Sequence, residues 1–209
     1  MKIKICGLSR EQDIDYINEA RPDYCGFVFA ESKRQVSPVQ AASLRRRLAE
    51  GITAVGVFVN APIENITTLY RDGVINIAQL HGGEDEAYIA ELKDVSTKSG
   101  KEPIPIIKVI KSEKISSPLP IPHSPLPINY YLLDSGAGSG ETFDWGRLNS
   151  LNIDKPWFLA GGINLDNIRQ AMAVNPYGID VSSGAETNGV KDREKILQLV
   201  AAIRKEKTV

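Results

Sequence analysis

The chain has 209 residues, of which 42% are hydrophobic and 24% charged, and its formal net charge at pH 7 is -1. This balance gives no electrostatic footprint for nucleic acid or an anionic membrane surface, so we expect small-molecule partners. The sequence contains neither an apolar stretch of membrane length nor a signal-peptide pattern, and it contains two cysteines. Two cysteines are too few for a disulfide framework, and together these features predict a cytoplasmic protein.

Short runs rich in apolar and β-branched residues recur along the chain, with helical patterns between most of them. Alternation of strand and helix requires parallel strands joined by right-handed crossovers, either in an open doubly wound sheet or in a closed eight-stranded barrel. Eight such runs favour closure, so we predict an α/β fold, a (β/α)8 TIM barrel formed by residues 1–209 as a single domain. The predicted strands cover residues 2–6, 23–29, 52–59, 74–81, 104–110, 129–134, 156–161 and 177–183.

Several helix starts are marked by capping residues. Ser9 and Gln12 have the spacing of a capping box, as do Ser37 and Gln40, and Pro38 suits a first helical position. Further helices are expected after Pro62, after Gly83, after Ile163 and over residues 192–205.

A proline-rich segment, residues 112–129, interrupts the alternation. Prolines remove backbone donors and clash with the preceding helical turn, so we expect an extended, irregular segment in place of a regular fifth helix. A partner-binding role is the alternative interpretation of this segment, and His123 within it is expected to be exposed. Its prolines are Pro118, Pro120, Pro122, Pro125 and Pro127.

Glycine-bearing stretches follow the last three predicted strands, at residues 136–140, 160–164 and 182–186. In a barrel of this kind the loops after the strands form the active-site face, and a phosphate commonly binds after strands seven and eight. Glycine lets backbone N–H groups approach an anion closely. The combination predicts a phosphate site and therefore a phosphorylated substrate.

Cys6 ends the first predicted strand. Side chains alternate along a strand, so Cys6 faces the barrel mouth if Ile3 and Ile5 pack against the helices. A thiolate there is a nucleophile or a base, and neighbouring positive charge would favour it. Lys4 lies on the same face, and we expect Asp180 to be its ion-pair partner because a lone buried lysine is unfavourable.

Other strand ends also carry reactive groups. Asp134 ends the sixth strand at the level of Cys6, where burial can tune a carboxyl group to act as a general acid without a metal. Arg34 is a donor fork suited to a carboxylate or a second phosphate, with a surface arginine as the alternative. His81 has no companion at metal-ligand spacing and is assigned to loop structure or substrate contact. Cys25 lies within a strand, where core packing is expected.

A set of motifs in this order resembles phosphoribosylanthranilate isomerase. The resemblance implies a (β/α)8 barrel of tryptophan biosynthesis that converts N-(5′-phosphoribosyl)anthranilate into 1-(2-carboxyphenylamino)-1-deoxyribulose 5-phosphate. This is an Amadori rearrangement, and it implies no metal and no organic cofactor. The motifs are KICGL, SKRQVSP, VFVN, QLHG, LLDS followed by GSGETFDW, LAGGIN and GIDVSSGAE.

The resemblance also implies roles for individual residues. Cys6 would be the general base, Asp134 the general acid and Arg34 the group that holds the anthranilate carboxylate. The loop GAGSG departs from the GGTG pattern of the family but keeps the outer glycines. The expected phosphate-binding residues are Gly138, Ser139, Gly140, Gly161, Gly162, Ser183 and Gly184, and possible supporting residues are Lys4, Gln79, His81 and Asp180.

Two other readings stay open. Another phosphosugar barrel is one: an indoleglycerol-phosphate synthase would use a lysine acid and a longer segment before the first strand, and a pentose-phosphate epimerase would need metal-binding histidines. A non-catalytic barrel that binds a phosphorylated metabolite is the other, and it would need the phosphate loops but not Cys6 and Asp134. The sequence leaves monomer and homodimer open.

Overall fold

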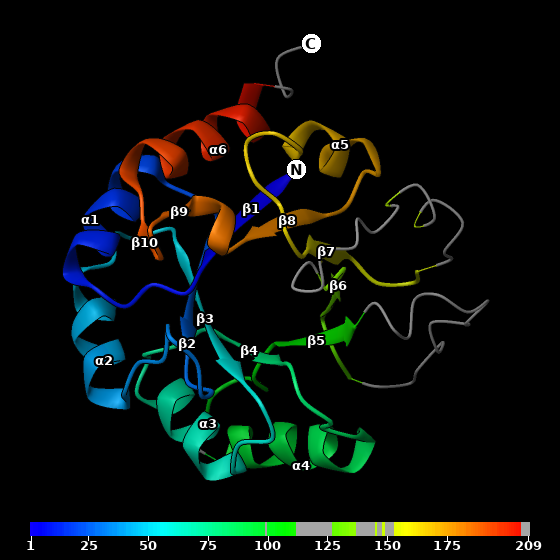
Figure 1. Ribbon diagram of the computed structural model, residues 1–209. Helices are drawn as coiled ribbons and strands as arrows, with labels where there is room; N and C mark the ends of the chain where they lie inside the picture. The colour runs from blue at the N-terminus through cyan, green and yellow to red at the C-terminus, as the bar shows by residue number, and fades with distance from the viewer. Residues whose placement is uncertain (99, 112–126, 137–144, 146–147, 149–152, 206–209) are drawn as a thin grey trace.

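The computed structural model describes residues 1–98, 100–111, 127–136, 145, 148 and 153–205. Eight parallel strands form a closed barrel in chain order, and the last strand pairs with the first (Figure 1). The predicted TIM barrel is therefore confirmed. The strands are β1 (Lys2–Cys6), β2 (Tyr24–Val28), β3 (Thr53–Phe58), β4 (Ile77–Leu80), β5 (Ile106–Lys111), β6 (Tyr130–Asp134), β7 (Trp157–Ala160) and β8 (Gly178–Val181).

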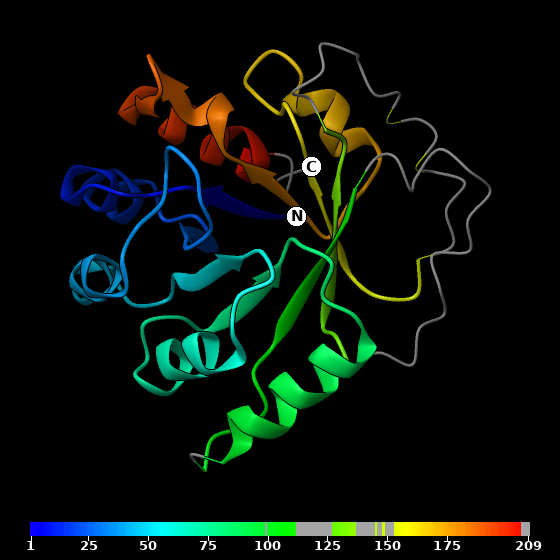
Figure 2. The same ribbon diagram turned by 60° about the horizontal axis from the view of Figure 1, so that its bottom comes forward.

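Among the described residues, the helices lie on the outside of the barrel between β1 and β5 and after β7, and α6 lies beside α1 where the ring closes (Figures 1 and 2). No helix in the described part of the chain is long and apolar enough to cross a membrane. Of the predicted proline-rich segment, residues 112–126 lie outside the described residues. The helices are α1 (Glu11–Ala20), α2 (Pro38–Arg47), α3 (Ile63–Arg71), α4 (Glu86–Thr97), α5 (Ile168–Ala173) and α6 (Arg193–Lys205), and a short hairpin, β9 (Glu186–Thr187) and β10 (Val190–Lys191), precedes α6.

The two faces of the barrel wall carry different side chains. Ile3 and Ile5 are fully buried in the large core cluster that includes the apolar faces of the helices, as the alternation along β1 predicts. A second, smaller cluster fills the barrel interior. Because apolar side chains occupy the lower interior, the space at the carboxyl ends of the strands is left for polar groups. The interior cluster consists of Tyr24, Val55, Ile77, Ile107, Val109, Leu132, Phe158 and Ala160.

The predicted cap of α2 is present in part. Ser37 accepts a hydrogen bond from the Gln40 backbone N–H at 3.2 Å, and Pro38 is the first helical residue. The side chain of Gln40 donates instead to the Ser9 carbonyl at 2.6 Å. The reciprocal half of the capping box is therefore replaced by a bond between the loop after β1 and α2.

The predicted capping box of α1 at Ser9 and Gln12 is wrong. The helix begins at Glu11 with Arg10 as its N-cap residue. The carboxylate of Asp13 accepts from the backbone N–H groups of Ser9 and Arg10 at 2.9 and 3.0 Å. Because an ionised acceptor binds these N–H groups more strongly than a hydroxyl or an amide would, the cap falls one residue later than predicted.

Candidate active site

A cavity of about 660 Å³ opens at the carboxyl ends of the strands and brings most of the predicted site residues together. Lys4 and Gly184 are not part of its lining, and Gly138, Ser139 and Gly140 lie outside the described residues. A larger hollow between α2 and α3 contains none of the predicted residues. The predicted residues in the lining are Cys6, Arg34, Gln79, His81, Asp134, Gly161, Gly162, Asp180 and Ser183.

The position of the Cys6 side chain depends on two neighbouring glycines, Gly26 and Gly7. A Cβ atom at Gly26, the neighbour of Cys6 on β2, would lie 2.6 Å from its Sγ atom. Gly7 has a φ of +85°, and a Cβ atom there would overlap the Cδ atom of Arg34. Glycine follows the cysteine because the chain turns through a left-handed conformation and the arginine stem crosses directly over it.

The charges around Cys6 form a buried pair. The Nζ atom of Lys4 lies 2.8 Å from the Oδ2 atom of Asp180, which confirms the predicted ion pair. Burial raises the pKa of the Cys6 thiol, while the positive charges of Lys4 and Lys191 act in the opposite direction. Burial opposes the charge on Lys4, but neighbouring groups, Asp180 foremost, outweigh it and raise the pKa of Lys4. At neutral pH the resting state therefore holds a Cys6 thiol beside a charged lysine.

Asp134 faces the loop after β4. The Oδ2 atom of Asp134 lies 3.3 Å from the Nε2 atom of His81, and its Oδ1 atom accepts from the Gly136 N–H at 3.1 Å. The hydrogen bond from His81 is the main cause that holds the pKa of Asp134 below its usual range, although burial opposes it. Gln79 contacts the other ring nitrogen of His81 at 3.5 Å. Asp134 therefore rests as an oriented carboxylate.

The loops after β7 and β8 are packed where only glycine fits. Gly161 and Gly162 have φ values of +97° and +64°. A Cβ atom at Gly161 would lie 2.9 Å from Oδ1 of Asp134, and one at Gly184 would overlap the Ile163 carbonyl. Within the described part of the chain, the N–H groups of Gly161 and Gly162 donate no hydrogen bond. These donors at the cavity edge fit an anion, and the phosphate role of the loops stays a prediction.

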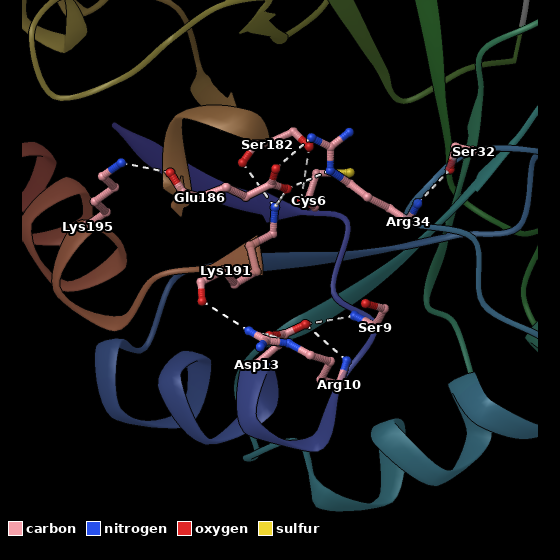
Figure 3. Close-up of polar contacts among 10 residues, drawn as sticks. All are labelled: Cys6, Ser9, Arg10, Asp13, Ser32, Arg34, Ser182, Glu186, Lys191 and Lys195. Carbon is pink, nitrogen blue, oxygen red and sulfur yellow. Dashed lines mark hydrogen bonds and ion pairs between the residues drawn. The ribbon is translucent and has the colours of Figure 1, made fainter. Parts of the chain in front are cut away.

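Arg34 is bound to a residue that the sequence analysis did not select. Its Nε and Nη2 atoms lie 2.6 and 2.8 Å from the two carboxylate oxygens of Glu186. The Nζ atom of Lys191 lies 2.7 Å from Oε1 of the same carboxylate. Figure 3 shows these three side chains gathered beside Cys6. Burial opposes the charge on Glu186, but the bonds from Arg34 and Lys191 outweigh it and lower its pKa to about 2.

A short sequence signal could have identified this hairpin. Asn188 and Gly189 both have positive φ and form the two-residue loop between β9 and β10. An Asn-Gly pair between two β-capable residues is the strongest short-range signal of a tight hairpin. That hairpin pairs Glu186 directly with Lys191 across its two strands. The signal predicts the pairing of these two residues but not the contact with Arg34.

Comparison with known proteins decides the family. Residues 3–202 match the family model described as N-(5'phosphoribosyl)anthranilate (PRA) isomerase. The chain belongs to this family. Phosphoribosylanthranilate isomerases are enzymes of tryptophan biosynthesis, so the predicted resemblance is confirmed.

Individual members of the phosphoribosylanthranilate isomerase family match over nearly their full length. A curated N-(5'-phosphoribosyl)anthranilate isomerase from Endomicrobium trichonymphae is 46% identical over 97% of this chain and 98% of its own. The crystal structure of TrpF from Jonesia denitrificans is 32% identical, with a TM-score of 0.83 over 100% of this chain and 98% of its own.

A third relative was solved with a ligand. It is a phosphoribosyl anthranilate isomerase in complex with reduced 1-(o-carboxyphenylamino)-1-deoxyribulose 5-phosphate, 28% identical, with a TM-score of 0.73 over 98% of this chain and 99% of its own. In the present chain, the described residues contain no group of three or more His, Cys, Asp and Glu side chains placed to hold a metal ion.

Proposed function

We propose that this protein isomerises N-(5′-phosphoribosyl)anthranilate to 1-(2-carboxyphenylamino)-1-deoxyribulose 5-phosphate, with Cys6 as general base and Asp134 as general acid. The observation that carries the proposal is that both side chains line one cavity, together with the glycine loops after β7 and β8. The complex of a relative with a reduced form of this product supports the same substrate class.

The first step opens the sugar ring. Asp134 donates its proton to the ring oxygen, the bond from that oxygen to C1′ breaks, and the nitrogen lone pair forms a C1′=N bond. The ring oxygen leaves as a hydroxyl group, and the substrate becomes a protonated Schiff base. A positioned acid contributes on the order of 10²- to 10⁴-fold to such a step.

The second step moves the double bond. The Cys6 thiolate removes the proton from C2′, and the electron pair forms a C1′=C2′ bond while the C1′=N electrons return to nitrogen. The resulting enolamine gains a proton at C1′ and loses its O2′ proton to give the C2′ ketone. The rearrangement is redox-neutral overall and needs no external oxidant or reductant, so one base and one acid are sufficient.

The charged ends of the substrate meet donors at the cavity edge. The anthranilate carboxylate is assigned to Arg34, whose Nη1 atom makes no hydrogen bond within the described residues. The phosphate is assigned to the loops with Gly162, Ser183 and Gly184, whose glycine backbone permits close approach. The assignment of Gly138, Ser139 and Gly140 to the phosphate is part of the same proposal.

The resting protonation of the pair is the reverse of what the reaction needs. The pKa of Cys6 is raised and that of Asp134 is lowered, so the proton resides on sulfur rather than on the carboxylate. A sugar that took the place of His81 beside Asp134 would remove the main cause of the lowered pKa. The reactive form is therefore a minor protonation state, in which the proton has moved from Cys6 to Asp134, and displacement of His81 by the substrate favours it.

The test is kcat/KM for this isomerisation, followed by the loss of substrate fluorescence, in the wild type, Cys6→Ser and Asp134→Asn. We expect wild-type turnover and a fall on the order of 10²- to 10⁴-fold in each variant. Cys25→Ala is the matched control, because Cys25 lies in the outer core cluster rather than in the cavity. Absence of wild-type turnover with retained binding of phosphorylated ligands would instead support a binding barrel.

A further inference from the structure

Glu186 is a buried carboxylate bound to Arg34, which lines the cavity, and the acid–base steps above do not use it. We propose that Glu186, held by Lys191, is a positioning residue that fixes one edge of the Arg34 guanidinium so that its other edge is presented to the substrate carboxylate. This inference rests on the proposed function, because the carboxylate it concerns belongs to the anthranilate ring.

The contact between Glu186 and Arg34 uses one edge of the guanidinium. Nε–H and one N–H of Nη2 donate to the two carboxylate oxygens at 2.6 and 2.8 Å. A guanidinium has five N–H donors in a fixed plane. The remaining N–H of Nη2 and one N–H of Nη1 point in parallel along the next edge. A second carboxylate can therefore bind end-on without displacing Glu186.

The stem of Arg34 is confined from the opposite side. Its Cδ atom lies directly over Gly7, where a Cβ atom would overlap it. The backbone N–H of Arg34 donates to the Ser32 hydroxyl at 3.2 Å. With its stem over the loop after β1 and its head on Glu186, the long side chain keeps one orientation. A free arginine side chain loses much rotamer entropy when it binds a carboxylate. In Arg34 the side chain is already ordered before the substrate binds, so this loss is smaller.

Glu186 is itself firmly anchored by the hairpin. It pairs directly with Lys191 across β9 and β10. The Nζ atom of Lys191 also donates to the Ser182 carbonyl at 3.0 Å, and Ser182 donates in turn to the Cys6 carbonyl at 3.2 Å. The Lys195 ammonium binds the Glu186 carbonyl at 2.7 Å. Figure 3 shows this chain of contacts running from α6 through the hairpin to the end of β1.

The charge balance keeps the contact in place when an anion enters. Two cations, Arg34 and Lys191, share one carboxylate, so the cluster has an excess of positive charge next to the cavity. The side chains of Glu186 and Lys191 are 5% and 1% exposed, so water does not compete for them. A substrate carboxylate is attracted by this excess charge and adds to the cluster instead of replacing Glu186.

The test compares the wild type with the double variant Glu186→Gln/Lys191→Met. The double variant keeps both volumes and removes both buried charges, whereas Glu186→Gln alone leaves Lys191 buried without a partner and can fail to fold. We expect KM for N-(5′-phosphoribosyl)anthranilate to rise roughly 10- to 100-fold, with a smaller change in kcat. Val190→Thr, an exposed change in the same hairpin, is the control and should leave both constants near those of the wild type.

Two further measurements separate positioning from a merely structural role. In an Arg34→Met background, the double change should add no further loss of kcat/KM, because its effect passes through Arg34. With N-(5′-phosphoribosyl)aniline, which lacks the carboxylate, the wild type and the double variant should give the same KM. Two results would overturn the inference. One is a kcat/KM in the triple variant that falls by the product of the losses in Arg34→Met and in the double variant. The other is an equal rise of KM on both substrates in the double variant.

The two proposals fail in different ways. Wild-type turnover combined with a double variant that behaves like the wild type would overturn the positioning role alone. Absence of wild-type turnover would remove the proposed function, and this inference with it.

Discussion

His81 and Asp134 face each other across the barrel mouth, with Nε2 of His81 3.3 Å from Oδ2 of Asp134. His81 lies in the loop after β4 and Asp134 at the end of β6, with β5 between those two strands. The contact orients the carboxylate toward the cavity and at the same time stabilises its charged form. One neighbour, His81, therefore both orients the Asp134 carboxylate and lowers its pKa.

Removal of this contact should change the protonation of Asp134. We expect His81→Ala to raise the pKa of Asp134 toward its ordinary value of 3.8, because the hydrogen bond from His81 is the main cause of the lowered value. Carboxyl ¹³C NMR during a pH titration measures this directly. His123→Ala, a change at the other histidine of the chain, is the control and should leave the titration unmoved. An unchanged Asp134 titration in His81→Ala would contradict the assigned cause.

Gly26 should be essential for the position of the thiol. We expect Gly26→Ala to lower kcat/KM roughly 100-fold, because a Cβ atom 2.6 Å from Sγ forces Cys6 out of place. Gly83→Ala is the matched control, since its Cβ atom would lie at an ordinary 3.7 Å from Asn60. Circular dichroism confirms that both variants are folded before their kinetics are compared. Wild-type activity in Gly26→Ala would show that the thiol position is not critical.

The pair of Lys4 and Asp180 should behave as one unit. Lys4→Met leaves a buried carboxylate without its partner, and we expect the free energy of unfolding to fall by about 3–5 kcal/mol. In Lys4→Met/Asp180→Asn neither charge remains, so most of that loss should be recovered. Urea unfolding of the two variants and of the wild type gives the comparison. Equal losses in the single and double variants would mean that the charges are not coupled.

The two cysteines should differ in their response to pH. Burial raises the pKa of Cys6 above 9.0 and that of Cys25 to about 12. A thiol with a raised pKa stays protonated to higher pH, so alkylation of Cys6 by iodoacetamide should be slow at pH 7 and accelerate as the pH rises past 9. Mass spectrometry of the labelled peptides gives both rates in one sample. Cys25 has no access from the cavity and should stay unlabelled while the protein is folded.

Much of the fold was readable because its causes are local. The alternation in KIKIC placed Ile3 and Ile5 in the outer core and Lys4 and Cys6 inside, as the structure confirms. The pair of Lys4 with Asp180 was also predictable, since a buried ammonium needs an anion and the first and last strands of a barrel are neighbours. These inferences used only strand period, closure and charge.

The contacts of Arg34 were not predictable in the same way. Arg34 and Glu186 are 152 positions apart in the chain, and no pattern links them. They meet because the Arg34 side chain, from the loop after β2, extends over Gly7 toward the hairpin after β8. This path depends on loop conformation rather than on hydrophobic period. The error at Ser9 has a related cause, since a carboxylate one turn into α1 took the place of the expected cap.

The closure of the barrel by β1 and β8 also has a consequence for synthesis on the ribosome. Lys4 is made early, but its partner Asp180 is 176 positions further along the chain. At ordinary elongation rates roughly 10–35 s pass between the synthesis of Lys4 and that of Asp180. Until then β1 lacks β8, the strand that pairs with one of its edges. The charged pair beside the Cys6 thiol is therefore completed only near the end of translation. A nascent chain that stops before β8 therefore carries the Cys6 thiol without the Lys4–Asp180 ion pair that lies beside it in the folded protein.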